Sequence, residues 1–258
     1  MQKEPSNHLL DSFPPDVRSS FAEHLHAVAL PRGTTLYKAS ETPRYAFFIC
    51  SGMASVVATT PDGQTGEVGL IGDEGVTGSL HLLGKAAVFS TCFIQIEGTA
   101  LRLPLALLRK AFEQNETVRS GILAFVQCQA IMLEQLGACN LFHDADSRLA
   151  RWLLMVQDRL QIASIDLTQE FLAQMLGSGR PTVTLACGAL QRAGAIEYRR
   201  GHIRIIDRDL LKTAACTCYA VAEENLAAYR AFALQGRSSE RRSANHSGGK
   251  GSFEPHPF

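Results

Sequence analysis

The feature that most constrains the fold is a long apolar stretch, Glu116–Phe142, in which hydrophobic residues recur at helical spacing. Seven positions, six of them apolar, are separated by alternating steps of four and three residues, which is the periodicity of a coiled coil. We interpret this stripe as the seam of a homodimer, although a core helix within one subunit would show a similar pattern. The seam residues are Val118, Ile122, Phe125, Gln129, Met132, Leu136 and Cys139. A second stripe, made of Leu123, Val126, Ala130 and Leu133, is expected to cover the rest of the subunit.

The same stretch is not expected to cross a membrane. Its part Gly121–Phe142 has Glu134 as its one charged residue, but it also contains three glutamines and Asn140, which are unfavourable in lipid. The polar start, Met1–Asn7, does not resemble a secretory signal. We therefore expect a cytoplasmic protein with no membrane partner.

The chain before this helix has the sequence pattern of a β protein. Between Leu30 and Pro104, short apolar runs alternate with turn signals such as Ser51-Gly52, Pro61-Asp62-Gly63 and Glu97-Gly98. Short strands at such spacing predict an antiparallel sandwich or barrel, here a β-roll. The first thirty residues are expected to be helical, because Val17, Phe21, Leu25 and Val28 recur at helical spacing after two prolines. A further short helix is expected over Leu105–Gln114.

The chain after the long helix is expected to be mostly helical. A two-stranded hairpin around Arg200-Gly201-His202 interrupts it, and no apolar periodicity remains beyond Gln235. The predicted class is α+β, with four regions: a β-roll domain with flanking helices (1–114), a dimerisation helix (115–142), a mostly helical C-terminal domain with a hairpin (143–235) and a disordered tail (236–258).

A pair of short helices is the most informative pattern in the C-terminal region. Thr168 is suited to cap the first helix, Gly177-Ser178-Gly179 ends it, and Pro181 opens the second helix where its missing N–H costs nothing. Two helices that cross steeply need a small residue at their contact, a residue tolerant of positive φ in the turn, and a β-branched residue locking the second helix. Ala173, Gly177 and Val183 meet these needs in register. The hairpin that follows is a wing.

Local charge distinguishes this unit from an ordinary helical hairpin. Lysine plus arginine number 25 and aspartate plus glutamate number 25, so the whole chain identifies no charged partner. From Gly177 to Arg208, however, the sequence contains six arginines and only two acidic residues, Glu197 and Asp207. Positive charge concentrated on a bihelical unit and its wing predicts binding to double-stranded DNA.

The motifs of this segment resemble a known family. They comprise Leu167-Thr168-Gln169, Leu172-Ala173, Leu176-Gly177, Arg180-Pro181-Thr182-Val183-Thr184, Leu190-Gln191, Gly194-Ala195-Ile196, Arg199-Arg200-Gly201 and Ile203-Arg204-Ile205. They look like the winged helix-turn-helix of the Crp/Fnr family of bacterial transcription factors, and the order of β-roll, long helix and C-terminal domain matches as well. The resemblance implies a transcriptional regulator, not an enzyme, that reads a palindromic operator as a homodimer and has RNA polymerase as a further partner.

The resemblance also assigns roles to individual residues. Arg180 is the candidate for bidentate reading of guanine, while Thr184 and Leu185 lie one turn further on, where they could meet base edges. Phosphate contacts are expected from Thr168, Ser178, Thr182, Arg199, Arg200 and His202, and the same surface includes Gln169 and Gly179. Pro181 and Leu185 stand where well-studied members carry a glutamate and an arginine, so their operator sequence is not transferred.

The region expected to hold an effector departs from the cyclic-nucleotide sensors of the family. Val76 stands where a ribose-binding acid is expected, and no arginine occurs between Arg44 and Arg102. A buried cyclic phosphate without a cation is unfavourable, so we expect no tight binding of cAMP or cGMP. The candidate effector residues are Gly75, Val76, Thr77, Phe89 and Ser90.

Other chemistries find little support in the sequence. Seven scattered cysteines suit reduced thiols better than a disulfide framework, and the part before Cys50 has none to hold an iron–sulfur cluster. Cys216-x-Cys218 is the one close pair, interpreted here as small residues with no metal assigned. A haem on His81 or Cys92 and a metal-dependent enzyme both lack the required ligands, so no cofactor is predicted. The remaining alternative is a ligand-binding or protein-interaction module without DNA specificity.

Overall fold

The computed structural model describes residues 6–246, with backbone alone for 235–246. Two short helices begin it, α1 (His8–Asp11), capped by Asn7, and α2 (Pro15–Phe21). The chain then enters strand β1 (His26–Leu30), which pairs with β5. The helical pattern predicted for the first thirty residues therefore ends at Phe21, and Val28 lies in a strand because its backbone hydrogen bonds go to the sheet.

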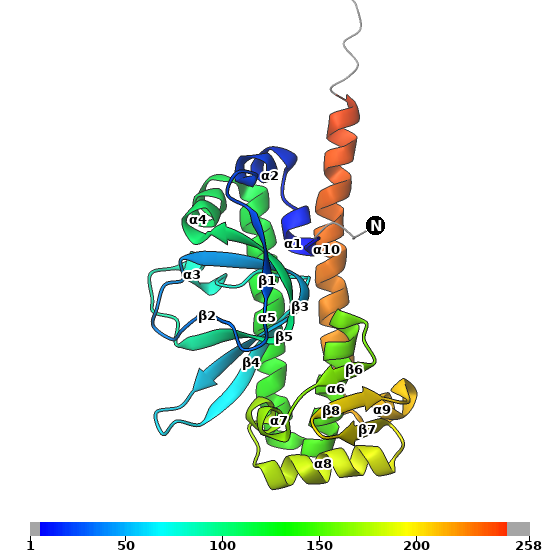
Figure 1. Cartoon of the computed structure of the whole chain (residues 1–258). Coiled ribbons are helices and arrows are strands. Elements are labelled where there is room, and N and C mark those ends of the chain that lie inside the picture. Colours follow the sequence, from blue (N-terminus) through cyan, green and yellow to red (C-terminus); the bar gives the residue numbers. More distant parts are fainter. Residues whose placement is uncertain (1–5, 247–258) are drawn as a thin grey trace, which may run out of the picture.

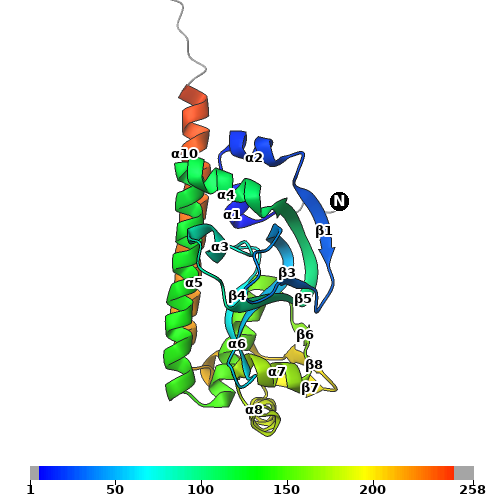
Figure 2. The same ribbon diagram turned by 90° about the vertical axis from the view of Figure 1, so that its left-hand side faces the viewer.

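The N-terminal domain is an antiparallel β-roll, as predicted. Its sheet has the order β1-β5-β3-β4, with β2 (Thr35–Tyr37) also paired with β5. The remaining strands are β3 (Tyr45–Thr59), β4 (Thr65–Ile71) and β5 (Ser90–Pro104), and helix α3 (Leu80–Leu83) lies between β4 and β5. The sheet curls around an apolar core that includes Phe48, Ile49 and Leu103, all fully buried (Figure 2).

Two of the expected turns are bends inside continuous strands. Gly52 in β3 has a φ of +73°, and a Cβ there would lie 2.5 Å from the carbonyl oxygens of Ile96 and Glu97. A Cβ on Gly98 of β5 would lie 2.0 Å from the carbonyl oxygen of Ser51. The register shifts at this point, as expected of a bulge, so the glycines let two long paired strands bend together. The short runs predicted on either side are parts of one strand each.

Helix α5 (Glu116–Phe142) follows the short α4 (Leu105–Gln114), and both occupy their predicted positions. The Asn115 side chain caps α5 by accepting a hydrogen bond from the Val118 amide at 3.0 Å. Helix α10 (Cys218–His246) packs alongside α5 for much of its length (Figure 1). The tail expected to be disordered from 236 is thus helical through His246, because an established helix adds each further residue at little cost. Residues 247–258 lie outside the described part.

The predicted dimer seam is wrong in orientation. Val118, Ile122, Phe125 and Cys139 are fully buried within the chain, and the Gln129 side chain donates a hydrogen bond to the Leu70 carbonyl of β4 at 3.0 Å. This stripe faces the chain's own β-roll and α10, and these elements cover its buried side chains. The exposed face of α5 instead includes Leu123 and Leu133 of the second stripe, each nearly half exposed, and Ile131.

The C-terminal domain is a winged helix-turn-helix. It comprises α6 (Ala145–Leu160), β6 (Ser164–Asp166), α7 (Gln169–Leu176), α8 (Arg180–Arg192), β7 (Ile196–Arg199), β8 (His202–Ile205) and α9 (Arg208–Ala214). The hairpin β7–β8 is present as predicted. Strand β6, which the sequence analysis missed, pairs with β8 and completes a three-stranded sheet.

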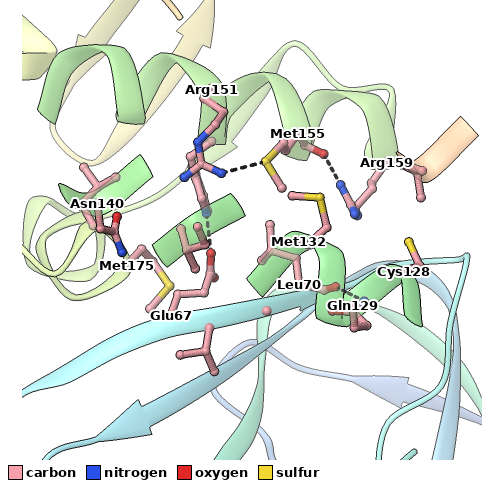
Figure 3. Close-up of a pocket in the computed structure, with 16 residues that line it drawn as sticks. Glu67, Leu70, Cys128, Gln129, Met132, Asn140, Arg151, Met155, Arg159 and Met175 are labelled. Carbon is pink, nitrogen blue, oxygen red and sulfur yellow. Dashed lines mark hydrogen bonds between the residues drawn. The ribbon is translucent and has the colours of Figure 1, made fainter. Parts of the chain in front are cut away.

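The two domains share a core. Met53, Val57 and Leu70 of the β-roll belong to the same apolar cluster as the helices α6, α7 and α8. Buried polar contacts cross the boundary too, because the Trp152 indole N–H of α6 donates to Glu67 Oε1 of β4 at 2.8 Å (Figure 3). The C-terminal domain therefore packs directly on the sheet.

Candidate nucleic-acid interface and sensor cavity

The helix-turn-helix has the local geometry that the sequence predicts. Thr168 Oγ1 accepts a hydrogen bond from the Phe171 amide at 3.2 Å and caps α7. Gly177 adopts the left-handed conformation, with φ +55°, in the turn. Val183 is fully buried and locks α8 against the rest of the domain. The cap of α7, the turn and the buried valine of α8 are therefore all present at their predicted positions.

Helix α8 lies at the outer edge of the molecule, at the bottom in Figure 1. Its first turns expose the predicted base-reading side chains Arg180, Thr184 and Leu185, and also Thr182. Leu185 is 71% exposed, which is unusual for a large apolar residue and leaves it available for a contact with a partner.

The wing lies beside the start of α8. Arg200 and Gly201 both have positive φ, +49° and +86°, as a two-residue hairpin turn of the primed type requires. A hollow of about 390 Å³ separates wing and helices, and its lining brings together residues predicted to contact DNA. The lining consists of Thr168, Gln169, Glu170, Arg180, Tyr198, Arg200 and Gly201.

The charge of this surface is smaller than the arginine count suggested. Arg180 forms an ion pair with Glu170, and Arg204 pairs with Glu197 at 2.5 Å. His202 lies 2.5 Å from Asp166. These pairs are exposed, and exposed pairs contribute only about 0–1 kcal/mol, so phosphates can compete with the carboxylates.

Two predicted participants also have structural roles. The Ser178 hydroxyl accepts a hydrogen bond from the Arg148 guanidinium at 2.8 Å and is half-buried, so it helps to hold the turn. Gly179 is the N-cap residue of α8. Arg208, counted in the basic cluster, binds Asp158 at 2.6 Å and the Tyr219 hydroxyl at 2.8 Å. Arg199 and Arg200 on the wing are exposed, and neither side chain has a hydrogen bond or ion pair among the described residues.

The β-roll and α5 border a mostly apolar cavity of about 500 Å³ that is open to solvent on one side, where Phe89 is exposed. Polar atoms reach it from Tyr37, Ser79, Ser90 and Gln129, whereas no charged residue is among the described residues that line it. The full lining is Tyr37, Val56, Ala58, Val68, Gly69, Ile71, Gly78, Ser79, Leu80, Ala87, Val88, Phe89, Ser90, Val126, Gln129, Ala130 and Leu133.

Only part of the predicted effector set lines this cavity. Phe89 and Ser90 do, but Val76 is fully buried in the core and bridges to Phe48. A Cβ on Gly75 would lie 2.1 Å from the Phe125 ring, so that backbone is pressed against α5. Thr77 Oγ1 accepts a hydrogen bond from the Phe47 amide at 3.1 Å. These three residues shape the loop and do not face a ligand.

The loop Gly72–Gly75 connects the β-roll to the C-terminal elements, a role that the sequence did not indicate. Glu74, 1% exposed, accepts a hydrogen bond from Arg159 of α6 at 2.9 Å. The Tyr229 hydroxyl of α10 donates to the Glu74 carbonyl at 3.1 Å, and Arg230 pairs with Asp73 at 2.9 Å. Side chains separated by at least 85 residues in sequence thus fix one loop.

Comparison with known proteins identifies the family. The family model described as "Crp-like helix-turn-helix domain" matches residues 147–214, and the one described as "Cyclic nucleotide-binding domain" matches residues 27–115. The chain belongs to the Crp/Fnr family. This Crp/Fnr chain is a DNA-binding transcriptional regulator, from a family of regulators and not of enzymes.

Relatives agree with this assignment. The chain is 24% identical over 208 residues to the "CRP-like cAMP-activated global transcriptional regulator" of Mycobacterium tuberculosis, covering 78% of this chain and 93% of the relative. Its fold is similar to that of FixK2 from Bradyrhizobium japonicum, with a TM-score of 0.63, 17% identity and coverage of 75% and 98% of the two chains. The c-di-GMP responsive regulator CLP of Xanthomonas campestris gives a TM-score of 0.62 at 14% identity, with 75% and 100% coverage. The Crp/Fnr fold is therefore common to chains with different effectors.

Proposed function

We propose that this regulator reads a palindromic operator as a homodimer, with one copy of α8 in each of two successive major grooves. The observation that carries the proposal is the outer position of α8, whose first turns expose Arg180, Thr184 and Leu185 beside the wing. A helix entering the major groove presents such N-terminal side chains to base edges, while Arg199 and Arg200 reach phosphates from the wing.

Arg180 must exchange partners when DNA is bound. In the free chain its guanidinium pairs with Glu170 on α7, and both side chains are mostly exposed. A guanine offers Arg180 two acceptors in place of one carboxylate, and that pairing provides about 1–3 kcal/mol of discrimination. The pair with Glu170 therefore keeps Arg180 near its working position without preventing its release.

The exposed face of α5 is our candidate for the dimer contact. Leu123, Ile131 and Leu133 are 46%, 37% and 48% exposed on a helix whose opposite face is already buried by β4 and α10. Palindromic sites require a two-fold symmetric protein, and a long helix paired with its own copy provides such an axis.

Selection of bound sequences from random double-stranded DNA tests this function. We expect enrichment of an inverted repeat whose half-sites lie about one helical turn apart, with affinity falling steeply as salt increases. The full chain should be used at low ionic strength, with and without small-molecule extracts. Absence of any enriched sequence under all these conditions would contradict the proposal and favour an interaction module.

We also propose that the sensor cavity binds an uncharged, largely apolar effector and not a cyclic nucleotide. Burying a phosphate among apolar side chains, with hydroxyls and one amide as the polar groups, leaves its charge uncompensated. The cavity is in the size range of small-molecule sites.

The uncharged fluorophore N-phenyl-1-naphthylamine is a suitable probe for this cavity. We expect it to bind the wild type, and cAMP at millimolar concentration not to displace it. Val126→Trp, which fills the cavity from α5, should abolish binding, whereas Leu210→Trp on α9 should not. Micromolar affinity for cAMP in calorimetry would overturn the proposal.

The remaining properties follow from this function. A regulator of transcription acts in the cytoplasm and has RNA polymerase as its expected protein partner. Helix α5 is long and apolar enough to cross a membrane by length and composition. Its buried face contacts the β-roll and α10, which supports a role within the folded protein instead.

A further inference from the structure

Four potential metal ligands meet where α5 ends and α10 begins. Cys139 lies in the last turn of α5, and His143 is the C-cap residue of that helix. Cys216 lies between α9 and α10, and Cys218 is the first residue of α10. The ligand atoms of all four residues lie within 4.8 Å of one another.

The individual distances match a tetrahedral site for one ion. Cys139 Sγ and Cys216 Sγ are 3.5 Å apart, and Cys218 Sγ lies 3.5 Å from His143 Nδ1. With Zn–S bonds of about 2.3 Å and Zn–N bonds of about 2.0 Å, tetrahedral angles place neighbouring ligand atoms roughly 3.5–3.8 Å apart. These two distances are thus already close to those between ligands of a single ion, and the other distances among the four ligand atoms do not exceed 4.8 Å.

The surroundings fit a structural site. Cys139, Cys216 and Cys218 are 0%, 7% and 3% exposed, and they form a small cluster apart from the two main cores. The Gln135 side chain amide lies 2.9 Å from Cys218 Sγ, where it can donate a hydrogen bond to a thiolate. Such outer hydrogen bonds orient metal-bound sulfur.

We propose that Cys139, His143, Cys216 and Cys218 bind one zinc ion as a closed Cys₃His site. Zinc suits three soft sulfurs and an imidazole in tetrahedral arrangement, and four protein ligands leave no position for a substrate. Each thiol gives up its proton to the solvent when it binds the ion, so binding is weaker at low pH.

The ion would tie three segments together at one place. His143 belongs to the short link between α5 and α6, and α6 opens the DNA-binding domain. Cys216 belongs to the link that leaves this domain, and Cys218 begins α10 directly after that link. Zinc would therefore fix both chain crossings between the long helices and the DNA-binding domain, and so hold α8 in a constant position relative to the dimer face.

Metal analysis of the full chain tests the proposal directly. Protein purified under reducing conditions should contain about one zinc per chain by plasma mass spectrometry. Chain stripped by a chelator and loaded with cobalt alone should show the intense visible bands of tetrahedral cobalt and a near-ultraviolet band from thiolate charge transfer. Both results are expected without any DNA or effector present.

Variants separate ligands from nearby cysteines. Cys216→Ser and His143→Ala should lose the thiolate-rich cobalt spectrum and most of the bound zinc. Cys50→Ser, which alters a cysteine of β3 outside the cluster, should keep one zinc per chain. His143→Cys should retain the ion with a spectrum shifted toward four sulfur ligands, which guards against confusing loss of a ligand with loss of the fold.

Each other outcome overturns the proposal. If the reduced wild type contains no zinc and shows no cobalt bands, the three cysteines are only a cluster of buried thiols. An intact mass two daltons below the reduced value, lost in Cys216→Ser, identifies a disulfide that involves Cys216. Iron with acid-labile sulfide indicates a cluster in place of zinc. Full zinc content in both Cys216→Ser and His143→Ala would place the metal elsewhere.

Discussion

Individual side chains in this protein fall into two classes: those that hold the domains together and those that we propose contact DNA. Glu67 and Glu74 are buried carboxylates of the β-roll that bind groups on α6. Arg180 and Arg200 lie on the outer surface, one paired with an exposed carboxylate and the other free of partners among the described residues. We expect the first class to affect stability and the second class to affect recognition.

Burial raises the pKa of Glu67 to about 7, and the hydrogen bonds from Ser55 and Trp152 offset this only in part. The folded chain then keeps a proton that the unfolded chain loses, so stability falls as pH rises from about 4.5 to about 7 and levels off above. This shift in the pKa of Glu67 corresponds to about 3 kcal/mol in the free energy of unfolding. Glu67→Gln cannot titrate, so its unfolding free energy should lack this decline. Urea denaturation across this pH range compares the two, and parallel curves would contradict the expectation.

The two arginines should differ in how they contribute to DNA binding. Arg180→Ala should reduce discrimination between operator and mutated operator by about 1–3 kcal/mol per half-site, because a base contact is lost. Arg200→Ala should weaken binding to all DNA nearly equally and lower the salt slope by about one. Fluorescence anisotropy at two salt concentrations measures both effects. Equal loss of specificity in the two variants would count against the assignment.

At the scale of elements, helix α5 serves two surfaces at once. One face is buried by the β-roll and α10, and a Cβ on Gly75 would collide with Phe125 on that face. The other face carries Leu123 and Leu133 in solvent. Residues on the two faces should therefore respond differently to substitution, the first through folding and the second through association.

Charges placed on the exposed face should separate the subunits. The variant Leu123→Glu/Leu133→Glu should sediment as a folded monomer, because two carboxylates would have to be buried in the contact between helices. Leu210→Glu on α9, equally exposed in the wild type, should leave the association unchanged. Circular dichroism checks that all variants are folded. A double variant that remains fully dimeric would exclude this face.

At the scale of the whole molecule, sensor and DNA-binding domain behave as one packed body. The pairs Glu67 with Trp152 and Glu74 with Arg159 cross the boundary between the β-roll and α6. Met53, Val57 and Leu70 extend the apolar core of the C-terminal domain into the sheet. A change in the β-roll therefore reaches the helix-turn-helix through direct contacts.

The pair of Glu74 and Arg159 should be the most costly of these contacts to break. Arg159→Met leaves a carboxylate buried without its partner, and we expect a loss of about 3–5 kcal/mol. Glu74→Gln/Arg159→Met removes both charges and should recover most of it. Arg230→Met breaks a half-exposed pair with Asp73 and should cost less than about 1 kcal/mol. Chemical denaturation measures all three, and equal losses in the two single variants would contradict the ranking.

The sequence by itself determined the features that depend on near neighbours in the chain. The cap at Thr168, the positive φ at Gly177 and the turn at Arg200-Gly201 are local requirements, so the winged helix-turn-helix could be predicted in register. The long helix and the β-roll followed from periodicity. The sequence could not predict which face of α5 is buried, because both stripes are apolar. Only the packing of the sheet and α10 selects between them.

Tertiary structure alone decided the contacts between distant segments. Glu74 meets Arg159, and the two cysteines beyond the wing meet Cys139 and His143, from positions far apart in the chain. The arginine count overstated the charge of the interface for the same reason, because Glu170 and Asp166 lie outside the basic segment in sequence but beside it in space. Coulomb attraction and ligand geometry depend on distance through space, which a linear pattern does not contain.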